Sequence, residues 1–130
     1  LLKQLQQVMG LTFLFISHDL SVVAHTCDHV AVMYLGRLVE VAPTRKLFAS
    51  PRHPYTKALF SAIPSLNPEA ATKAQKLEGE IPSPSNMPVG CKFHSRCPHA
   101  IDDCRITEPS LMPVDGDHEV ACFRWKELFA

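Results

Sequence analysis

The residues that decide the fold are 12–41, TFLFISHDLSVVAHTCDHVAVMYLGRLVEV. Residues 12–17 form a short apolar run without alternation, which is typical of a strand buried on both faces in a parallel sheet. A turn at His18-Asp19 follows, and the next apolar residues recur at helical spacing: Leu20, Val23, Ala24 and Cys27. The stretch therefore predicts a strand, a turn and a helix in direct succession.

Two more apolar runs complete this stretch, at residues 30–34 and 37–41. Leu35-Gly36 lies between them, where the chain can reverse, so the pair predicts a hairpin. Upstream, apolar residues at helical spacing in residues 1–9 predict a first helix that ends at Gly10. The order helix, strand, helix, strand, strand indicates the edge of an α/β domain, here a truncated sheet.

Composition excludes several kinds of partner. The 130 residues balance 13 basic against 13 acidic side chains, so no net positive charge favours nucleic acid or an anionic membrane. Hydrophobic residues make up 46%, which is typical of a globular domain, and no apolar run approaches the ~20 residues of a membrane span. The chain opens without Met and without a signal peptide, so we expect a piece of a longer protein.

The chain is uneven along its length. All eleven prolines lie between Pro43 and Pro113, and four of the five cysteines lie between Cys91 and Cys122. Residues 1–65 carry six basic and three acidic side chains, whereas residues 66–130 carry seven and ten. These differences predict two parts of unlike architecture.

His18 stands where the predicted buried strand ends and the helix begins. In open α/β sheets, ligands bind beyond the carboxyl ends of the strands. A histidine there can donate a hydrogen bond to an anion such as phosphate. On position alone, a partly buried histidine that caps the loop is the simpler interpretation.

The letters around His18 favour the binding role. FISHDL at residues 15–20, with CDHVAVMYLGRLVE at residues 27–40, closely resembles the end of an ABC-transporter ATPase domain, which has a P-loop NTPase fold. In that family the histidine of the SHD triplet is the switch-loop residue, which contacts the γ-phosphate of ATP and helps to position the attacking water. The resemblance gives this catalytic and ATP-binding role to His18, and it implies ATP and Mg²⁺ as cofactors of the full-length protein.

The other motifs of such an ATPase are missing from the chain. None of the five glycines fits the phosphate-binding pattern G-x-x-x-x-G-K-[ST], no acidic pair follows an apolar strand to hold Mg²⁺, and no LSGGQ-like signature occurs. Phosphoryl transfer needs all of these parts. We therefore interpret residues 1–42 as the C-terminal remnant of an ABC ATPase core, inactive alone, which supplies the switch histidine to a larger site.

Residues 43–66 predict two short helices, the first with Thr44 as a cap for free amides and the second with Pro54 in its first turn. For His53 and Tyr55, packing and local hydrogen bonds are the simpler interpretation than ligand binding, because no partner ligands stand nearby. HPYTKALFSAIP at residues 53–64 resembles the HPYT motif of dipeptide, oligopeptide and nickel importers, whose ATPases carry a C-terminal extension from this point. One departure follows Glu40, where relatives usually place a glycine soon after the glutamate.

Residues 67–90 are expected to form a linker. Residues 67–76 are polar and alanine-rich, and a short exposed helix is expected there. Residues 80–90 are rich in proline and serine. Such a segment has little capacity to bury surface. It separates the ATPase remnant from the cysteine-rich residues 91–130.

Four cysteines, Cys91, Cys97, Cys104 and Cys122, follow the pattern C-x5-C-x6-C-x17-C. Three kinds of chemistry could use them: a pair of disulfides, a structural zinc site with His94, His99 or His118 as substitutes, or an iron–sulfur cluster. A reducing compartment disfavours disulfides, and the spacing matches neither the tight zinc pairs nor the common ferredoxin patterns. The spacing thus leaves the metal open, while basic neighbours of the cysteines favour ligation of some anionic centre.

The surrounding letters extend the resemblance. The pattern C-x-F-x-x-R-C at residues 91–97 and the closing H-x-V-A-C at residues 118–122 resemble the C-terminal domain of the importer ATPases, some of which carry a [4Fe–4S] cluster. The resemblance implies Cys91, Cys97, Cys104 and Cys122 as the ligands of such a cluster, with zinc as the alternative. Cys27 lies outside this set and is expected to be a small buried residue.

Together these resemblances imply an α/β fold, the edge of an ABC ATPase sheet followed by a small irregular α+β cysteine-rich domain. The implied function is that of the C-terminal part of an ATPase subunit that energises import of dipeptides or oligopeptides, peripheral on the cytoplasmic face of the membrane. The implied partners are a second ATPase subunit, transmembrane permease subunits and, indirectly, a substrate-binding protein. The alternative is a stand-alone metal-binding or interaction module without ATPase activity. A P-loop, a signature motif and a Mg²⁺-binding strand upstream of Leu1 would distinguish the two.

Overall fold

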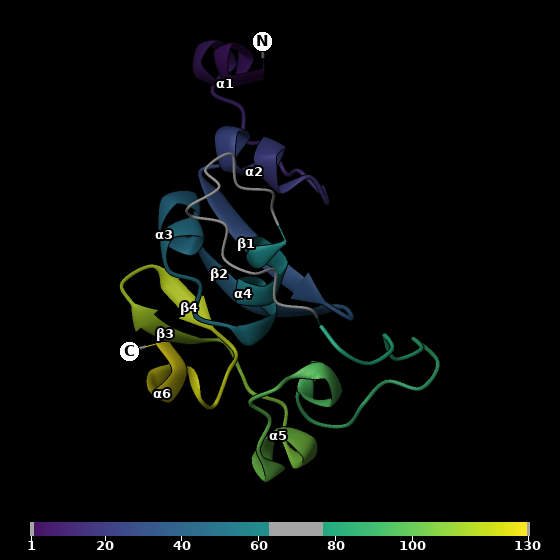
Figure 1. Ribbon diagram of the computed structural model, residues 1–130. Coiled ribbons are helices and arrows are strands. Elements are labelled where there is room, and N and C mark those ends of the chain that lie inside the picture. The colour runs from purple at the N-terminus through teal and green to yellow at the C-terminus, as the bar shows by residue number, and fades with distance from the viewer. Residues whose placement is uncertain (1, 63–76, 130) are drawn as a thin grey trace.

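A computed structural model of the chain describes residues 2–62 and 77–129 (Figure 1). These residues form a small α/β domain, which confirms the predicted class, but the predicted edge of a P-loop NTPase sheet is not found among the described strands. The helices and strands are α1 (Leu2–Met9), α2 (Leu20–Thr26), β1 (His29–Tyr34), β2 (Arg37–Pro43), α3 (Thr44–Ala49), α4 (Pro54–Ser61), the 3₁₀ helix η2 (His94–Arg96), α5 (Asp102–Ile106), β3 (Met112–Asp115), β4 (His118–Val120) and α6 (Trp125–Phe129).

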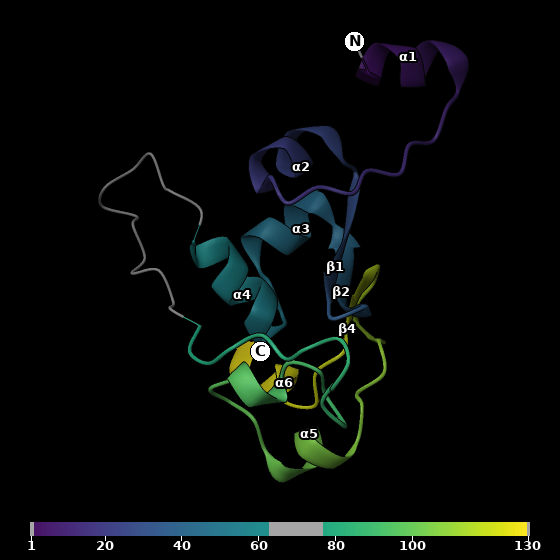
Figure 2. The same ribbon diagram turned by 90° about the vertical axis from the view of Figure 1, so that its right-hand side faces the viewer.

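The four strands form one sheet in the order β1-β2-β4-β3, with every pairing antiparallel. Figure 2 shows α2, α3 and α4 stacked on one side of this sheet. β4 pairs with β2 through Glu40 opposite Val120 and Val41 opposite Glu119. Strands from both ends of the sequence therefore share a single sheet.

The hairpin of β1 and β2 forms as predicted around Leu35-Gly36. Both residues have positive φ, 45° and 75°, which is the backbone of a two-residue type I′ turn. Such a turn matches the right-handed twist of the two strands that it joins. The register shifts between Val32 and Met33, where a bulge adds local twist.

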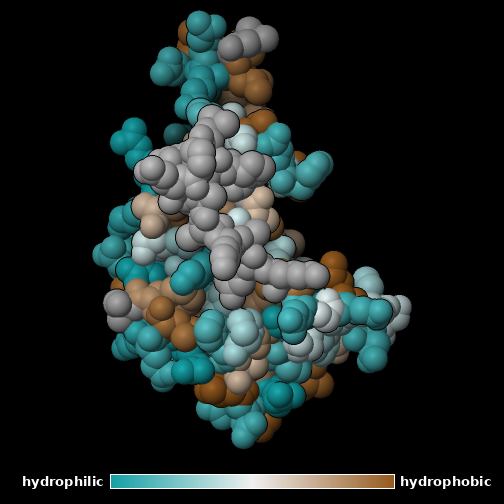
Figure 3. Space-filling model, in the orientation of Figure 1, coloured by the Kyte–Doolittle hydropathy of each residue, from teal (hydrophilic) through white to brown (hydrophobic). Residues whose placement is uncertain are grey.

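The predicted strand at residues 12–17 is wrong, because residues 11–17 are extended without strand pairing. No described strand lies beside this segment, so its backbone groups have no ladder partner. Its side chains are accordingly exposed, with Leu14 at 91% and Ile16 at 97%. Figure 3 shows hydrophobic residues on the surface at the end of the molecule that carries α1. The apolar run thus indicates a segment suited to burial, but no described element covers it.

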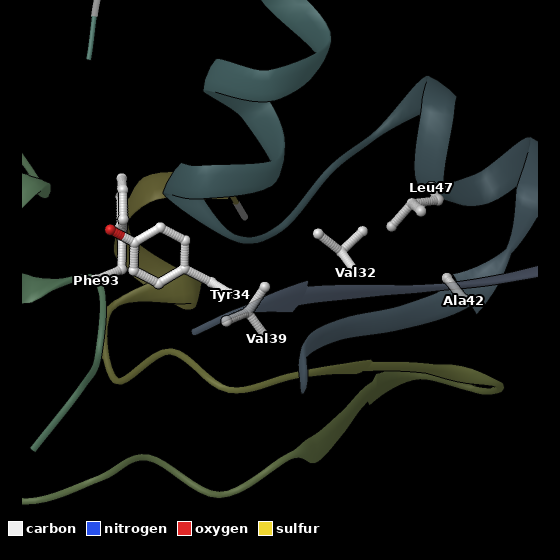
Figure 4. Packing of buried hydrophobic residues seen from close by; sticks show 6 residues of the cluster. All are labelled: Val32, Tyr34, Val39, Ala42, Leu47 and Phe93. Atoms are coloured by element: carbon white, nitrogen blue, oxygen red, sulfur yellow. The ribbon is translucent and has the colours of Figure 1, made fainter. Parts of the chain in front are cut away.

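The hydrophobic core joins the two ends of the sequence. Phe93 is 1% exposed and lies edge-on to Tyr34 of β1, with 5.2 Å between the ring centroids. Figure 4 shows this pair beside Val39, with Leu47 of α3 and Ala42 of β2 at the other end of the cluster. Full burial of one such apolar side chain stabilises the fold by about 1.5–3 kcal/mol, so Phe93 attaches the cysteine segment firmly to the hairpin.

Two local details differ from expectation. Thr44 opens α3, but its hydroxyl donates to the carbonyl of Cys27 at 2.6 Å instead of capping the helix, and Pro43 occupies the N-cap position. Cys27 follows α2 as its C-cap and is half-buried, where a buried helix position was expected. The Thr44 hydroxyl thereby ties the end of α2 to the start of α3.

The predicted linker at residues 67–90 is described only from residue 77, so the expected helix at 67–76 and the end of the 43–66 segment lie outside the described residues. Residues 77–90 contain no helix or strand. Among the described helices the longest, α1 and α4, have eight residues each, and none is long and apolar enough to cross a membrane.

Candidate functional site

The turn that carries His18 is held by its two neighbours. The hydroxyl oxygen of Ser17 accepts a hydrogen bond from the Asp19 amide at 3.0 Å. Oδ1 of Asp19 accepts from the amides of Ser21 and Val22 at 2.9 and 3.2 Å, which makes Asp19 the N-cap of α2. Ser17 and Asp19 thus fix the backbone, and His18 remains exposed.

The four predicted ligands Cys91, Cys97, Cys104 and Cys122 line a single pocket with a volume of about 20 Å³. Cys91 and Cys97 flank η2, Cys104 lies on α5, and Cys122 follows β4. Arg124 and three histidines, His53, His94 and His99, also line this pocket. α5 and α6 lie at the opposite end of the molecule from α2, which follows His18 (Figures 1 and 2). The structure therefore gathers the cysteines and keeps them apart from the turn that carries His18.

Gly90 allows the cysteine-bearing segments to cross closely. The Cys91 amide donates to the carbonyl of Cys104 at 2.8 Å. Gly90 has a φ of 70°, and a Cβ built on it would stand 2.5 Å from that same carbonyl oxygen. A side chain at position 90 would thus be strained by both its backbone conformation and its neighbour.

Burial controls the protonation of the thiols. Desolvation raises the pKa of Cys91 and of Cys97, and it raises the pKa of Cys122 to about 11. The other thiols of the pocket add to each shift by charge repulsion, while Arg124 opposes it at Cys97. These three thiols are therefore protonated at neutral pH when nothing is bound, and ligation of a metal has to release their protons.

The histidines near the cysteines differ in what they can do. Nδ1 of His94 donates to the Cys91 carbonyl at 2.8 Å, so the neutral ring has a lone pair on Nε2 for a metal. Nε2 of His118 instead donates to Oε1 of Glu40 at 2.7 Å, away from the residues that line the pocket. Of the histidines considered as substitute ligands, His94 and His99 lie at the pocket and His118 does not.

The four thiols line one pocket, but in their present arrangement they do not form a metal site. Within the described residues, no group of three or more His, Cys, Asp or Glu side chains is arranged to hold a metal ion. In a four-iron cluster each thiolate binds a different iron, so its donors stand farther apart than those around one ion. The pocket, at about 20 Å³, has room for about one water-sized species. A cluster therefore requires the lining segments to move apart.

A buried carboxylate that sequence analysis missed links the two parts of the chain. Glu40 is 0% exposed and accepts from the amides of Arg52 and His53 at 2.5 and 3.0 Å, as well as from His118. These donors come from the loop before α4 and from β4. The signal was a single acidic residue inside an apolar strand, because a charge at such a position needs buried partners.

Residues 39–104 match the family model described as "Oligopeptide/dipeptide transporter, C-terminal region". The chain belongs to this family, and the predicted resemblance is confirmed. Among curated proteins, it is 57% identical over 124 residues to a Brucella ovis protein named as a peptide import ATP-binding protein. The aligned residues make up 95% of this chain and 39% of the relative. The chain is also 50% identical over 123 residues to the dipeptide transport ATP-binding protein DppF of Haemophilus influenzae, covering 95% and 38%. The chain thus spans about two fifths of the length of these relatives.

Proposed function

We propose that this chain is the C-terminal part of the ATP-hydrolysing subunit of an ABC importer for dipeptides or oligopeptides. The observation that carries the proposal is the exposed His18 on a turn fixed by Ser17 and Asp19, in a chain of the oligopeptide/dipeptide transporter family. The names of the relatives, which refer to ATP binding and peptide transport, support the same activity.

His18 acts at the γ-phosphate of ATP in this proposal. ATP and Mg²⁺ are bound by motifs that this chain does not contain, and His18 donates a hydrogen bond to the terminal phosphate and orients the attacking water. The exposed apolar side chains of residues 11–16 are proposed to be covered by the rest of the subunit. The subunit would pair with a second ATPase subunit and bind permease subunits at the cytoplasmic face of the membrane.

A pair of histidine variants in the full-length subunit tests this role. His18→Ala should lose most ATP turnover while ATP still binds. His25→Ala is the matched control, because His25 is exposed on α2 and its ring bonds only the Ser21 carbonyl four residues earlier. Near-normal turnover in His18→Ala would refute the switch role.

We also propose that Cys91, Cys97, Cys104 and Cys122 ligate a [4Fe–4S] cluster, with zinc as the alternative metal. Support comes from the four thiols on one pocket and from Arg124, whose charge offsets an anionic centre there. The centre would be structural or regulatory. Anaerobically purified full-length subunit should contain about four iron and four sulfide per chain, as expected of one such cluster. Zinc without visible absorbance would overturn the choice of metal, and the absence of both metals would overturn ligation itself.

A further inference from the structure

An open groove lies beside the end of the hairpin formed by β1 and β2. Its volume is about 410 Å³, within the range of roughly 300–1,000 Å³ that is typical of ligand-binding sites. One wall is the start of β2, at Arg37 and Leu38, and the other wall is the chain at residues 108–111. Pro109 of the second wall is buried, whereas Arg37, Leu38 and Ser110 are exposed. The groove is therefore a hollow with an anchored wall, and solvent reaches the side chains of β2 that line it.

The backbone of Leu38 faces this groove without a partner strand. Arg37 flanks the two-residue turn in a hydrogen-bonded pair, so the next residue, Leu38, belongs to a non-hydrogen-bonded pair of the hairpin. Its N–H and C=O groups therefore point away from β1, to the side on which β4 pairs with β2. That pairing includes only Glu40 and Val41 of β2. Within the part of the chain that the structure describes, no backbone hydrogen bond joins Leu38 to β4 or to residues 108–111. β2 thus begins with an unpaired strand edge.

The charges at the groove favour an acidic occupant. Nε of Arg37 lies 3.0 Å from Oε1 of Glu108, and the other oxygen of Glu108 lies 3.6 Å from Nζ of Lys92. Two cations therefore share one carboxylate, and the net charge of the three side chains is positive. A guanidinium carries several N–H donors, more than one shared carboxylate can accept. Arg37 can therefore bind a second carboxylate that enters the groove.

We propose that this groove binds an extended acidic segment of a partner polypeptide, which adds a strand to β2 at Leu38. In strand addition of this kind, main-chain hydrogen bonds provide affinity and alternate side chains provide specificity. The residue opposite Leu38 exchanges both backbone hydrogen bonds with it. An Asp or Glu at the neighbouring position, opposite Arg37, lies on the same face of the sheet as the guanidinium. The groove thus selects a strand that carries an acidic residue next to the paired one.

The test uses the full-length subunit and a fluorescently labelled pentapeptide, Val-Glu-Val-Glu-Val, blocked at its C-terminus. The same peptide with lysine in place of glutamate is the matched control. We expect the glutamate peptide to bind in anisotropy titrations, and the lysine peptide to bind roughly tenfold more weakly, because an attraction at Arg37 becomes a repulsion. The bound glutamate peptide should also slow hydrogen exchange of the Leu38 amide, since that amide gains an acceptor.

Two pairs of variants separate backbone pairing from charge. Leu38→Pro removes the N–H donor that faces the groove but no hydrogen bond to β1, and Leu38→Ala is its control for the lost side chain. Leu38→Pro should bind the glutamate peptide roughly fivefold more weakly than Leu38→Ala. Arg37→Gln should weaken binding by up to about fivefold, whereas Arg45→Gln, which changes an exposed arginine on α3, should leave it unchanged. Glu108→Gln releases Arg37 from its ion pair and should strengthen binding.

The outcomes distinguish strand addition from attraction by charge alone. Attraction by charge alone predicts that the glutamate peptide binds without slowing exchange at Leu38, and that result would overturn the proposal. Equal binding of the two peptides would overturn the acidic specificity, and binding of neither would refute the site. If Leu38→Pro folds poorly, exchange at the Leu38 amide of the wild-type subunit decides.

Discussion

Glu40→Gln should loosen the attachment of β4 to β2. The carboxylate of Glu40 accepts three hydrogen bonds, from two backbone amides and from the imidazole of His118, and it is fully buried. Glutamine has nearly the same shape but only one acceptor oxygen. Its amide nitrogen must therefore face at least one of these three donors, which loses its acceptor.

The expected magnitude follows from that single orphaned donor. A buried donor without an acceptor costs about 1–3 kcal/mol, and the remaining bonds lose the strength that the charge gave them. A local destabilisation of about 2 kcal/mol makes the equilibrium constant for opening roughly 30-fold larger. Amide exchange through that opening becomes faster by the same factor. No larger loss is expected, because Phe93 still packs against Tyr34.

Hydrogen exchange at Ala121 measures this opening. The Ala121 amide follows β4 and donates to the carbonyl of Val39 on β2 at 2.9 Å, so it exchanges when the two strands separate. Glu119→Gln is the matched control, because Glu119 lies on β4, is exposed, and loses the same charge. Exchange at Ala121 that is equal in the two variants would refute the reasoning about Glu40.

Three further predictions concern packing and protonation in the full-length subunit. Gly36→Ala should destabilise the fold by about 1–2 kcal/mol, because Gly36 has a positive φ. Gly90→Ala should destabilise it by about 1–3 kcal/mol more than Gly36→Ala, because a Cβ at Gly90 would also stand 2.5 Å from a carbonyl oxygen. Thermal unfolding measures both variants. Phe93→Ala should destabilise by about 3–5 kcal/mol, with the exposed Phe123→Ala close to wild type in the same melts. The pKa of His53 is lowered to about 4 in the folded chain, so the unfolded chain binds the proton first as pH falls. The contribution of His53 to stability is therefore complete above pH 6.5 and should decline by up to about 3 kcal/mol between pH 6.5 and 4. Urea unfolding at a series of pH values should show that His53→Asn lacks this decline.

Local signals predicted the elements that depend on local physics. The two-residue turn at Leu35-Gly36 needs a residue that tolerates positive φ, and the sequence shows it directly. Pro54 at the first turn of α4 is equally local, because its missing amide and fixed φ suit that position. The four cysteines could be grouped as one set because their residue type alone indicates shared chemistry.

Long-range pairing could not be predicted in the same way. β3 and β4 have only four and three residues, too few to show an alternating pattern, and β4 pairs with a strand about eighty positions earlier. The apolar run at residues 12–17 indicated burial correctly as a tendency, but a strand also needs a neighbour, and none lies among the described residues. Thr44 was misjudged because a hydroxyl can cap a helix or reach a distant carbonyl, and only the fold decides between them.

The buried contacts also bear on whether the cysteine segment is an independent module. Phe93 and His118 belong to that segment, yet they complete the packing of Tyr34 and the hydrogen bonds of Glu40 on the hairpin. Without them, the hairpin would expose an aromatic surface and leave a charged carboxylate short of one donor, both of which are costly. β1, which follows α2 directly, lies in the same sheet as the strand that leads to Cys122. The cysteine segment therefore shares its sheet and its core with the hairpin, which argues against a module that folds separately.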